Sequence, residues 1–232
     1  MRVPVLALLR TLPRTLLVAS AFASAFMLPA CSRGPSAPSP VVAARPEPVA
    51  PSPPPRRAPD SPRPKYIGAL DPTVTQADLD SLWYHQLMVP VEGVLRKALR
   101  DDFTARRSRE NNGGLHAALD IPAPRSTPVV ATDDMVIGRL VTGPVGGIAL
   151  YATDPSNRFV YYYAHLERYR RGLAVGDRVA KGSIIGYVGT TGNAPPNAPH
   201  LHFQVMKRVA GRAWWDGPPV NPYFILALDG RR

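Results

Sequence analysis

The chain has 232 residues, of which 45% are hydrophobic, and this suits one globular domain with appendages better than two domains. Its single cysteine, Cys31, excludes a disulfide bond within the chain. The formal net charge of +11 makes the chain basic, which either favours contact with anionic polymers and lipid headgroups or serves solubility alone.

The first thirty residues predict an export signal. Arg2, Arg10 and Arg14 form a basic start, and residues 16–28 are apolar and uncharged. A run of this length is typical of the core of a signal peptide and is too short to span a bilayer comfortably. We therefore predict a signal peptide over residues 1–30 and an exported protein, for which nucleic acid is not an expected partner.

Cys31 directly follows this segment, within Leu28-Pro-Ala-Cys31. The sequence is similar to the bacterial lipobox, in which the signal is removed before a cysteine that carries a lipid. Ordinary cleavage after Ala23-Ser-Ala25 is the alternative, because Pro29 is unusual at its position. Ser32 resembles the residue that goes with delivery to the outer membrane in Gram-negative lipoproteins. We expect a periplasmic protein held by a lipid on Cys31, with the outer membrane favoured over the inner one.

A proline-rich linker follows the cysteine. Residues 33–64 contain 12 prolines and show no periodic apolar pattern, so residues 31–64 are predicted to be a disordered tether. In a polyproline II conformation such a segment rises by about 3.1 Å per residue and would hold a domain up to roughly 100 Å from a membrane.

Residues 65–87 are predicted to form a short helical lead-in. Thr75 can cap a helix over residues 76–87, and Pro90 would stop it. His85 lies in this helix without a partner at metal-binding spacing, so we interpret it as a surface or hydrogen-bonded histidine.

From Met88 onwards the pattern changes to short strands separated by turn residues. We therefore predict a mainly β domain over residues 88–232, with an antiparallel sheet or sandwich. The expected strands are Val129–Ala131, Met135–Val141, Gly147–Ala152, Arg158–Ala164, Ile184–Val188 and His200–Met206.

Two histidines near the C-terminus alternate with apolar residues in the predicted strand His200–Met206. A strand directs residues i and i+2 to one face, so the imidazoles of His200 and His202 share a face. Zinc binds imidazole and carboxylate, and a catalytic zinc site keeps three protein ligands and one open position. His116, Asp120 and His202 would supply such a set.

The spacing of His116 and Asp120 would suit a helix, but Gly113-Gly114 before them and prolines after them disfavour one. We expect the pair on a loop that enters a strand. The His-Glu-x-x-His motif, whose glutamate is a general base, is absent, so another group must handle the proton.

His165 is the leading candidate for that group. It ends an alternating run in which Phe159, Tyr161 and Tyr163 are predicted to share its face. Glu167 would lie on the same side two residues later and is the alternative base.

Several motifs follow one another in a specific order, although His-x-His alone is a weak signal. They are His116-Ala-Ala-Leu-Asp120, Thr127-Pro-Val129, Tyr163-Ala-His165-Leu166, Val175-Gly-Asp-Arg-Val-Ala-Lys-Gly182, Ile185-Gly-Tyr-Val-Gly-Thr-Thr-Gly192 and Pro199-His-Leu-His-Phe203. The combination resembles the lysostaphin-like zinc metallopeptidases, the LytM-type peptidoglycan endopeptidases, over about residues 88–228.

This resemblance implies a mainly antiparallel β fold with the site in a groove. It implies zinc bound by His116, Asp120 and His202, with His165 and His200 beside the metal as catalytic residues of unassigned individual roles. The implied activity is metal-assisted hydrolysis of a peptide bond in peptidoglycan (murein). Cell-wall or division proteins are possible partners.

Two positions depart from the family pattern. Ala118 and Ser126 stand where the family commonly has glycine, and a positive φ at either would cost about 1 kcal/mol. Two non-enzymatic interpretations also remain open. Some relatives have lost metal ligands and activate amidases, and a basic domain on a tether would also suit a module that binds the cell wall without cleaving it.

Overall fold

The computed structural model describes residues 71–107 and 114–227. The predicted signal peptide over residues 1–30, the lipidated Cys31 and the tether over residues 31–64 lie outside the described residues and stay predictions.

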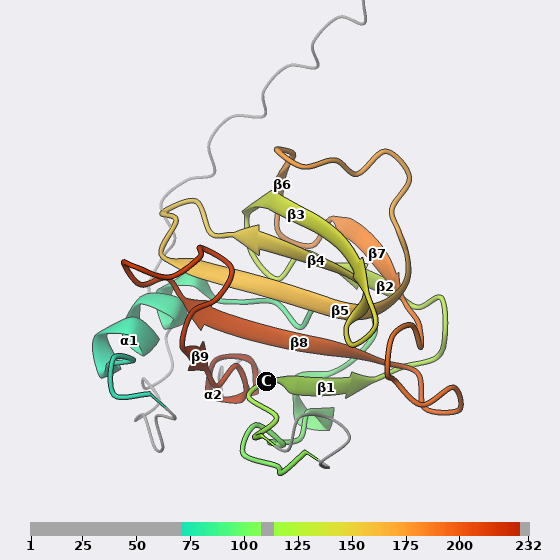
Figure 1. Cartoon of the computed structure of the whole chain (residues 1–232), viewed down its shortest axis with the longest axis horizontal. Coiled ribbons are helices and arrows are strands. Elements are labelled where there is room, and N and C mark those ends of the chain that lie inside the picture. The colour runs from blue at the N-terminus through green and yellow to red at the C-terminus, as the bar shows by residue number, and fades with distance from the viewer. Residues whose placement is uncertain (1–70, 108–113, 228–232) are drawn as a thin grey trace, which may run out of the picture. The chain divides into compact units, whose positions relative to one another are not determined.

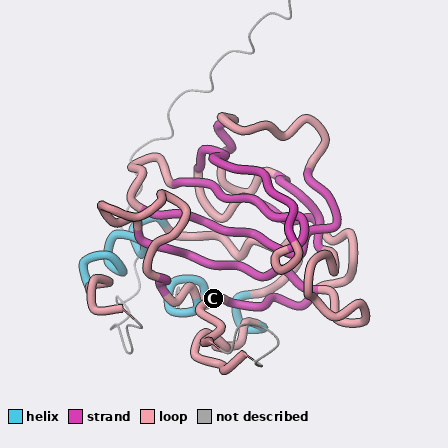
Figure 2. Tube along the Cα trace, in the orientation of Figure 1, coloured by secondary structure: helices cyan, strands magenta, loops and turns pink. Residues whose placement is uncertain are grey.

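One antiparallel sheet dominates the described part of the chain (Figures 1 and 2). Neighbouring strands follow the order β1-β8-β5-β4-β3-β6, while β7 pairs with β2 and β5, and β9 pairs with β8. The predicted mainly β, antiparallel fold is confirmed. The strands are β1 (Leu119–Pro122), β2 (Pro128–Val130), β3 (Met135–Gly143), β4 (Gly147–Thr153), β5 (Phe159–Tyr169), β6 (Arg178–Val179), β7 (Ile184–Val188), β8 (His200–Lys207) and β9 (Pro219–Val220).

The helical elements are short. They are the α-helices α1 (Gln76–His85) and α2 (Tyr223–Leu226) and the 3-10 helix η1 (Arg96–Ala98). Sequence patterning did not predict α2, β6 or β9, because elements of two to four residues carry no detectable period. No helix among the described residues is long and apolar enough to cross a membrane.

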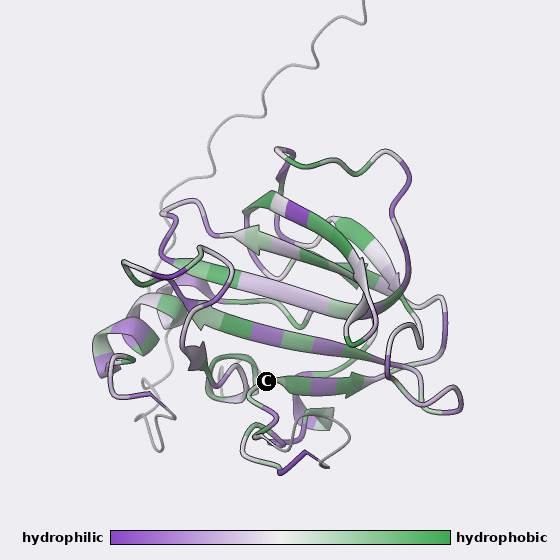
Figure 3. Ribbon diagram, viewed as in Figure 1, coloured by the Kyte–Doolittle hydropathy of each residue, from purple (hydrophilic) through white to green (hydrophobic). Residues whose placement is uncertain are grey.

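Strand β8 alternates as expected. Leu201, Phe203 and Val205 are fully buried, while His200 and His202 are partly exposed on the other face. Figure 3 shows this alternation as green and purple segments along β8. Because the apolar residues fill the core, the polar residues of β8 are held on the opposite face of the strand.

Helix α1 ends earlier than predicted. It stops at His85 because Gln86 adopts a left-handed conformation with φ 50°, and the Gln86 N–H donates to the Trp83 carbonyl oxygen. The predicted continuation to Leu87 is therefore wrong. Leu79 and Leu82 of α1 are fully buried in the same apolar cluster as the sheet residues, so this helix packs into the core of the domain.

Asp78 ties α1 to strand β8. Its carboxylate is buried and accepts hydrogen bonds from the Thr75 N–H and from Lys207 Nζ, each at 2.8 Å, and Arg158 Nη2 lies 3.3 Å away. Burial raises the pKa of this carboxyl, but the hydrogen bonds from Lys207 and Thr75 outweigh burial and lower the pKa below its ordinary value.

A lowered folded-state pKa means that Asp78 stabilises the fold above the unfolded pKa and that this contribution is lost as the pH falls through the folded pKa. We expect Asp78→Asn to cost about 1–3 kcal/mol of unfolding free energy at neutral pH. The cost should shrink as the pH is lowered below about 4. Denaturant unfolding measured across this range, with Asp80→Asn on the same helix as control, checks the effect. An equal cost at all pH values would contradict it.

Candidate metal centre

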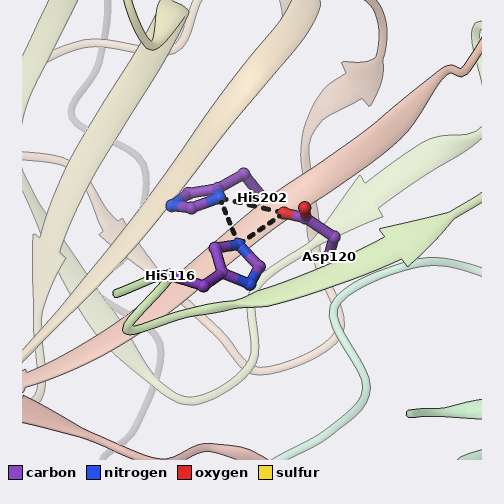
Figure 4. A group of neighbouring side chains, drawn as sticks. All are labelled: His116, Asp120 and His202. Atoms are coloured by element: carbon purple, nitrogen blue, oxygen red, sulfur yellow. Dashed lines mark hydrogen bonds and ion pairs between the residues drawn. The ribbon is translucent and has the colours of Figure 1, made fainter. Parts of the chain in front are cut away.

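Three side chains predicted as ligands converge at the pairing of β1 with β8 (Figure 4). Asp120 on β1 lies directly opposite His202 on β8 in the strand register. Asp120 Oδ1 is 2.9 Å from His202 Nδ1 and 3.0 Å from His116 Nε2, and the two nitrogens are 3.1 Å apart. The three ligand atoms therefore point at one place.

A loop before β1 carries His116, as expected. The N–H groups of His116 and Ala117 donate to the carbonyl oxygens of Ala105 and Phe103, each at 2.8 Å, and fix the loop. Ala117 has φ 55°, which turns the chain before it enters β1 at Leu119.

A positive φ was considered at Ala118 and Ser126, the two positions that depart from the family pattern, and only Ser126 has one. Ser126 has φ 64°, whereas the positive φ near the first ligand falls on Ala117 and not on Ala118. The substitution at position 118 therefore carries no left-handed strain, and the buried Ala118 side chain lies in the core.

Asp102 holds the first histidine, and sequence reasoning did not single it out. His116 Nδ1 lies 3.1 Å from the Asp102 carbonyl oxygen and 3.4 Å from its carboxylate Oδ1. The same carboxylate accepts from the Asp120 N–H at 3.3 Å. With Nδ1–H donating to Asp102, His116 presents Nε2 to the other two ligand atoms, as an oriented metal ligand does.

The contacts of His116 with Asp102 and Asp120 affect its protonation. Burial lowers the pKa of His116, but hydrogen bonds to Asp102 and Asp120 outweigh burial and raise the pKa to about 9. Burial raises the pKa of Asp120, while the two histidines lower it well below its usual range. A proton is thus held between His116 and two carboxylates, and a divalent ion would replace it.

Arg107 is a second residue that sequence reasoning missed. Its Nη2 atom lies 3.2 Å from His202 Nδ1 and 3.6 Å from Asp120 Oδ2, so a permanent positive charge borders the ligand group. Nothing in the periodicity of the chain marks this arginine, because it reaches the site from a loop.

His165 and His200 complete the site. The ring of His165 lies 5.0 Å from that of His200 and 5.7 Å from that of His202, measured between centroids. His165 Nδ1 is 2.8 Å from the Thr191 carbonyl oxygen, and His200 Nδ1 is 2.8 Å from the Ala198 carbonyl oxygen. Both Nδ1–H groups donate to these carbonyl oxygens, and the neutral ring of His165 then keeps an unprotonated Nε2. Burial lowers the pKa of His165 to about 4, so this ring is neutral at pH 7.

The prediction that His165 shares a strand face with Tyr161 and Tyr163 is wrong. Tyr161 and Tyr163 are fully buried in the core, whereas the ring that shares the site face is Tyr162, with its centroid 6.1 Å from that of His202. The reason is an irregularity in β5, where the register shifts and His165 adopts φ 60°. The extra residue reverses the alternation and directs the imidazole to the site.

Glu167 and His85, which the sequence analysis also considered, have partners outside the candidate metal centre. Glu167, the alternative base, pairs with Ser126 and Arg125. His85 Nδ1 is 2.6 Å from the carboxylate of the buried Asp133, so this histidine is hydrogen-bonded as interpreted.

The three convergent residues fit a zinc ion. Their ligand atoms lie within 4.8 Å of one another and comprise two imidazole nitrogens and one carboxylate oxygen, a donor set that zinc prefers. The orientation of His116 by Asp102 presents Nε2 as a ligand. Three residues that could hold a metal ion, beside two further imidazoles, form the arrangement of a hydrolytic metal site.

Residues 114–222 match the model of peptidase family M23. An L-Ala–D-Glu endopeptidase of Bacillus subtilis is 30% identical over 131 residues, which cover 52% of this chain and 40% of that protein. Peptidoglycan DD-endopeptidase ShyC of Vibrio cholerae is 31% identical over 112 residues, which cover 47% of this chain and 25% of that protein. The chain thus spans less than half the length of these curated relatives.

A solved structure of a LytM protein from Ruminococcus gnavus has the same fold. The match has a TM-score of 0.52 and 25% sequence identity, and covers 66% of this chain and 63% of that one. This fold likeness and the family match agree with the resemblance of the chain to LytM-type peptidases.

We predict that Asp102→Ala weakens zinc binding about tenfold, because the carboxylate steadies both His116 and the backbone of Asp120. Asp102→Asn keeps an acceptor for the Asp120 N–H and should lose less. Competition with a chromogenic zinc chelator measures both affinities. Zinc binding by Asp102→Ala within twofold of the unmodified chain would show that Asp102 does not position the ligands.

Proposed function

We propose that this chain is an exported zinc endopeptidase that hydrolyses peptide bonds of peptidoglycan cross-links. The proposal rests on the convergence of His116 Nε2, Asp120 Oδ1 and His202 Nδ1, with the imidazoles of His165 and His200 beside them. The M23 domain and its resemblance to a protein named a peptidoglycan DD-endopeptidase support the choice of substrate.

His116, Asp120 and His202 would hold the zinc ion. When bound, zinc supplies a Lewis acid that activates water and polarises the scissile carbonyl. His165 is neutral at pH 7 and uses Nδ1–H to contact Thr191, so its Nε2 can accept the proton of the attacking water. His200 Nε2 lies 3.8 Å from Asp120 Oδ1, and when it carries a proton this nitrogen can donate a hydrogen bond to the developing oxyanion or a proton to the leaving amine.

The bond that is cut is a separate part of the proposal. The two curated relatives are named for different bonds, L-Ala–D-Glu and a DD bond, so the domain alone does not fix it. We favour the cross-link between D-alanine and diaminopimelate, because the predicted signal and lipid-bearing cysteine suit a Gram-negative periplasm.

Zinc content and release of muropeptides from purified sacculi test the activity. His116→Ala should lose both bound zinc and release, since it removes a ligand. His165→Ala should retain zinc and lose release by a factor of about 100 or more, because it removes a proton acceptor. His85→Gln, which alters the histidine outside the site, is the matched control and should retain both.

Zinc-dependent release that survives His116→Ala would contradict the ligand assignment. A zinc-loaded chain that binds sacculi without releasing fragments would instead support a non-catalytic role, either as a wall-binding module or as an amidase activator.

Export and lipidation have their own test in a Gram-negative host. We propose that the lipid on Cys31 anchors the protein to the outer membrane, and we expect an alkyne-labelled fatty acid to be incorporated into the unmodified chain. Cys31→Ser should carry no label. An unlabelled, exported wild-type chain would show ordinary cleavage near residue 25 instead.

A further inference from the structure

A row of aromatic rings leads away from the candidate metal centre. The ring of Tyr162 on β5 lies 6.1 Å from His202 and 4.4 Å from Tyr151 on β4. Trp214, between β8 and β9, lies 6.4 Å from Tyr151, and Trp215 lies 5.6 Å from Trp214. We call these four rings, Tyr162, Tyr151, Trp214 and Trp215, the aromatic row.

Strand register and a glycine hold the row in place. Tyr162 pairs with Tyr151 across β5 and β4, and Tyr151 pairs with Arg139 on β3, so all three lie on the face of the sheet that carries His202. Trp214 packs onto β3 at Gly138, where a Cβ atom would lie 2.2 Å from the indole ring. The missing side chain at position 138 therefore makes room for Trp214.

The row reaches solvent at Trp215 and is bordered by positive charge. Trp215 is 37% exposed, and the other three rings are partly exposed. The guanidinium of Arg139 lies 4.7 Å from the Trp215 ring and 5.9 Å from the Tyr151 ring. Beside Trp214 and Gly138 lies a cavity of about 330 Å³, also lined by Thr153, Asn157 and Arg208.

This combination suits a sugar polymer. A pyranose ring has an apolar face of C–H groups that can cover an aromatic ring, and hydroxyl and amide groups at its rim that accept hydrogen bonds from arginine and asparagine. A peptide of three or four residues spans at most roughly 10–14 Å. A peptide held at the metal centre would therefore keep the glycan strand to which it is attached close to the aromatic row. The centroids of neighbouring rings in the row are 4.4 to 6.4 Å apart.

We propose that the aromatic row is a glycan-binding subsite, on which sugar rings of a peptidoglycan strand stack while the attached peptide reaches the metal centre. The choice of glycan rests on the proposed function. Because the ring of Tyr162 lies beside the ring of His202, the aromatic row begins at the candidate metal centre.

Calorimetric titration of the zinc-loaded full chain with peptide-free peptidoglycan glycan strands tests the subsite. These strands lack the bond cut by an endopeptidase, so binding is measured apart from hydrolysis. We expect saturable binding that Trp215→Ala and Tyr151→Ala each weaken roughly tenfold, as for loss of an aromatic anchor. Tyr187→Ala is the matched control, because Tyr187 also lies under an arginine, Arg168, but on β7 outside the row. It should bind like the unmodified chain.

Absence of binding to the strands, or equal binding by Trp215→Ala, would overturn the subsite. Row-dependent binding of free stem peptide in place of the strands would also overturn it, in favour of a peptide occupant. If strands bind through the row but sacculi release no fragments, the subsite stands and the endopeptidase proposal falls. Zinc-dependent release without strand binding would overturn the subsite and leave the endopeptidase proposal standing.

Discussion

The pairing of β1 with β8 is the constraint on which the site depends. It sets Asp120 directly opposite His202, and the buried Leu201 and Phe203 on the other face of β8 prevent a slip in register. A shift by one residue would turn His202 into the core and Leu201 toward the site. His116 then reaches the pair through the turn at Ala117, so two strands and one loop are enough to gather the ligand atoms.

Charges of both signs surround this pairing. Two carboxylates flank His116 and favour a cation there, whereas the guanidinium of Arg107, beside Asp120 and His202, opposes one. Each imidazole beside the ligand group is oriented by a backbone carbonyl oxygen, Thr191 for His165 and Ala198 for His200. The side chains that would perform chemistry are therefore fixed by main-chain atoms of the scaffold, which limits their reorganisation during a reaction.

The fold class and the convergence of His116, Asp120 and His202 were predictable from sequence because both depend on regular features. Alternation of Leu201 and Phe203 with His200 and His202 fixes the two faces of β8, and the order of the motifs supplied the remaining partners. The orientation of His165 was not predictable in this way, since one irregular residue with a positive φ reverses a face. Asp102 and Arg107 were missed because loops bring them to the site, and Trp214 because its contact depends on Gly138 in a distant strand.

X-ray absorption at the zinc edge tests the proposed ligand set most directly, because it identifies the atoms bound to the ion in solution. For the zinc-loaded chain, we predict two imidazole ligands together with oxygen, and one imidazole after His202→Ala. A spectrum with the same number of imidazoles in both proteins, or one without any imidazole, would contradict the assignment of His116, Asp120 and His202 as the ligands.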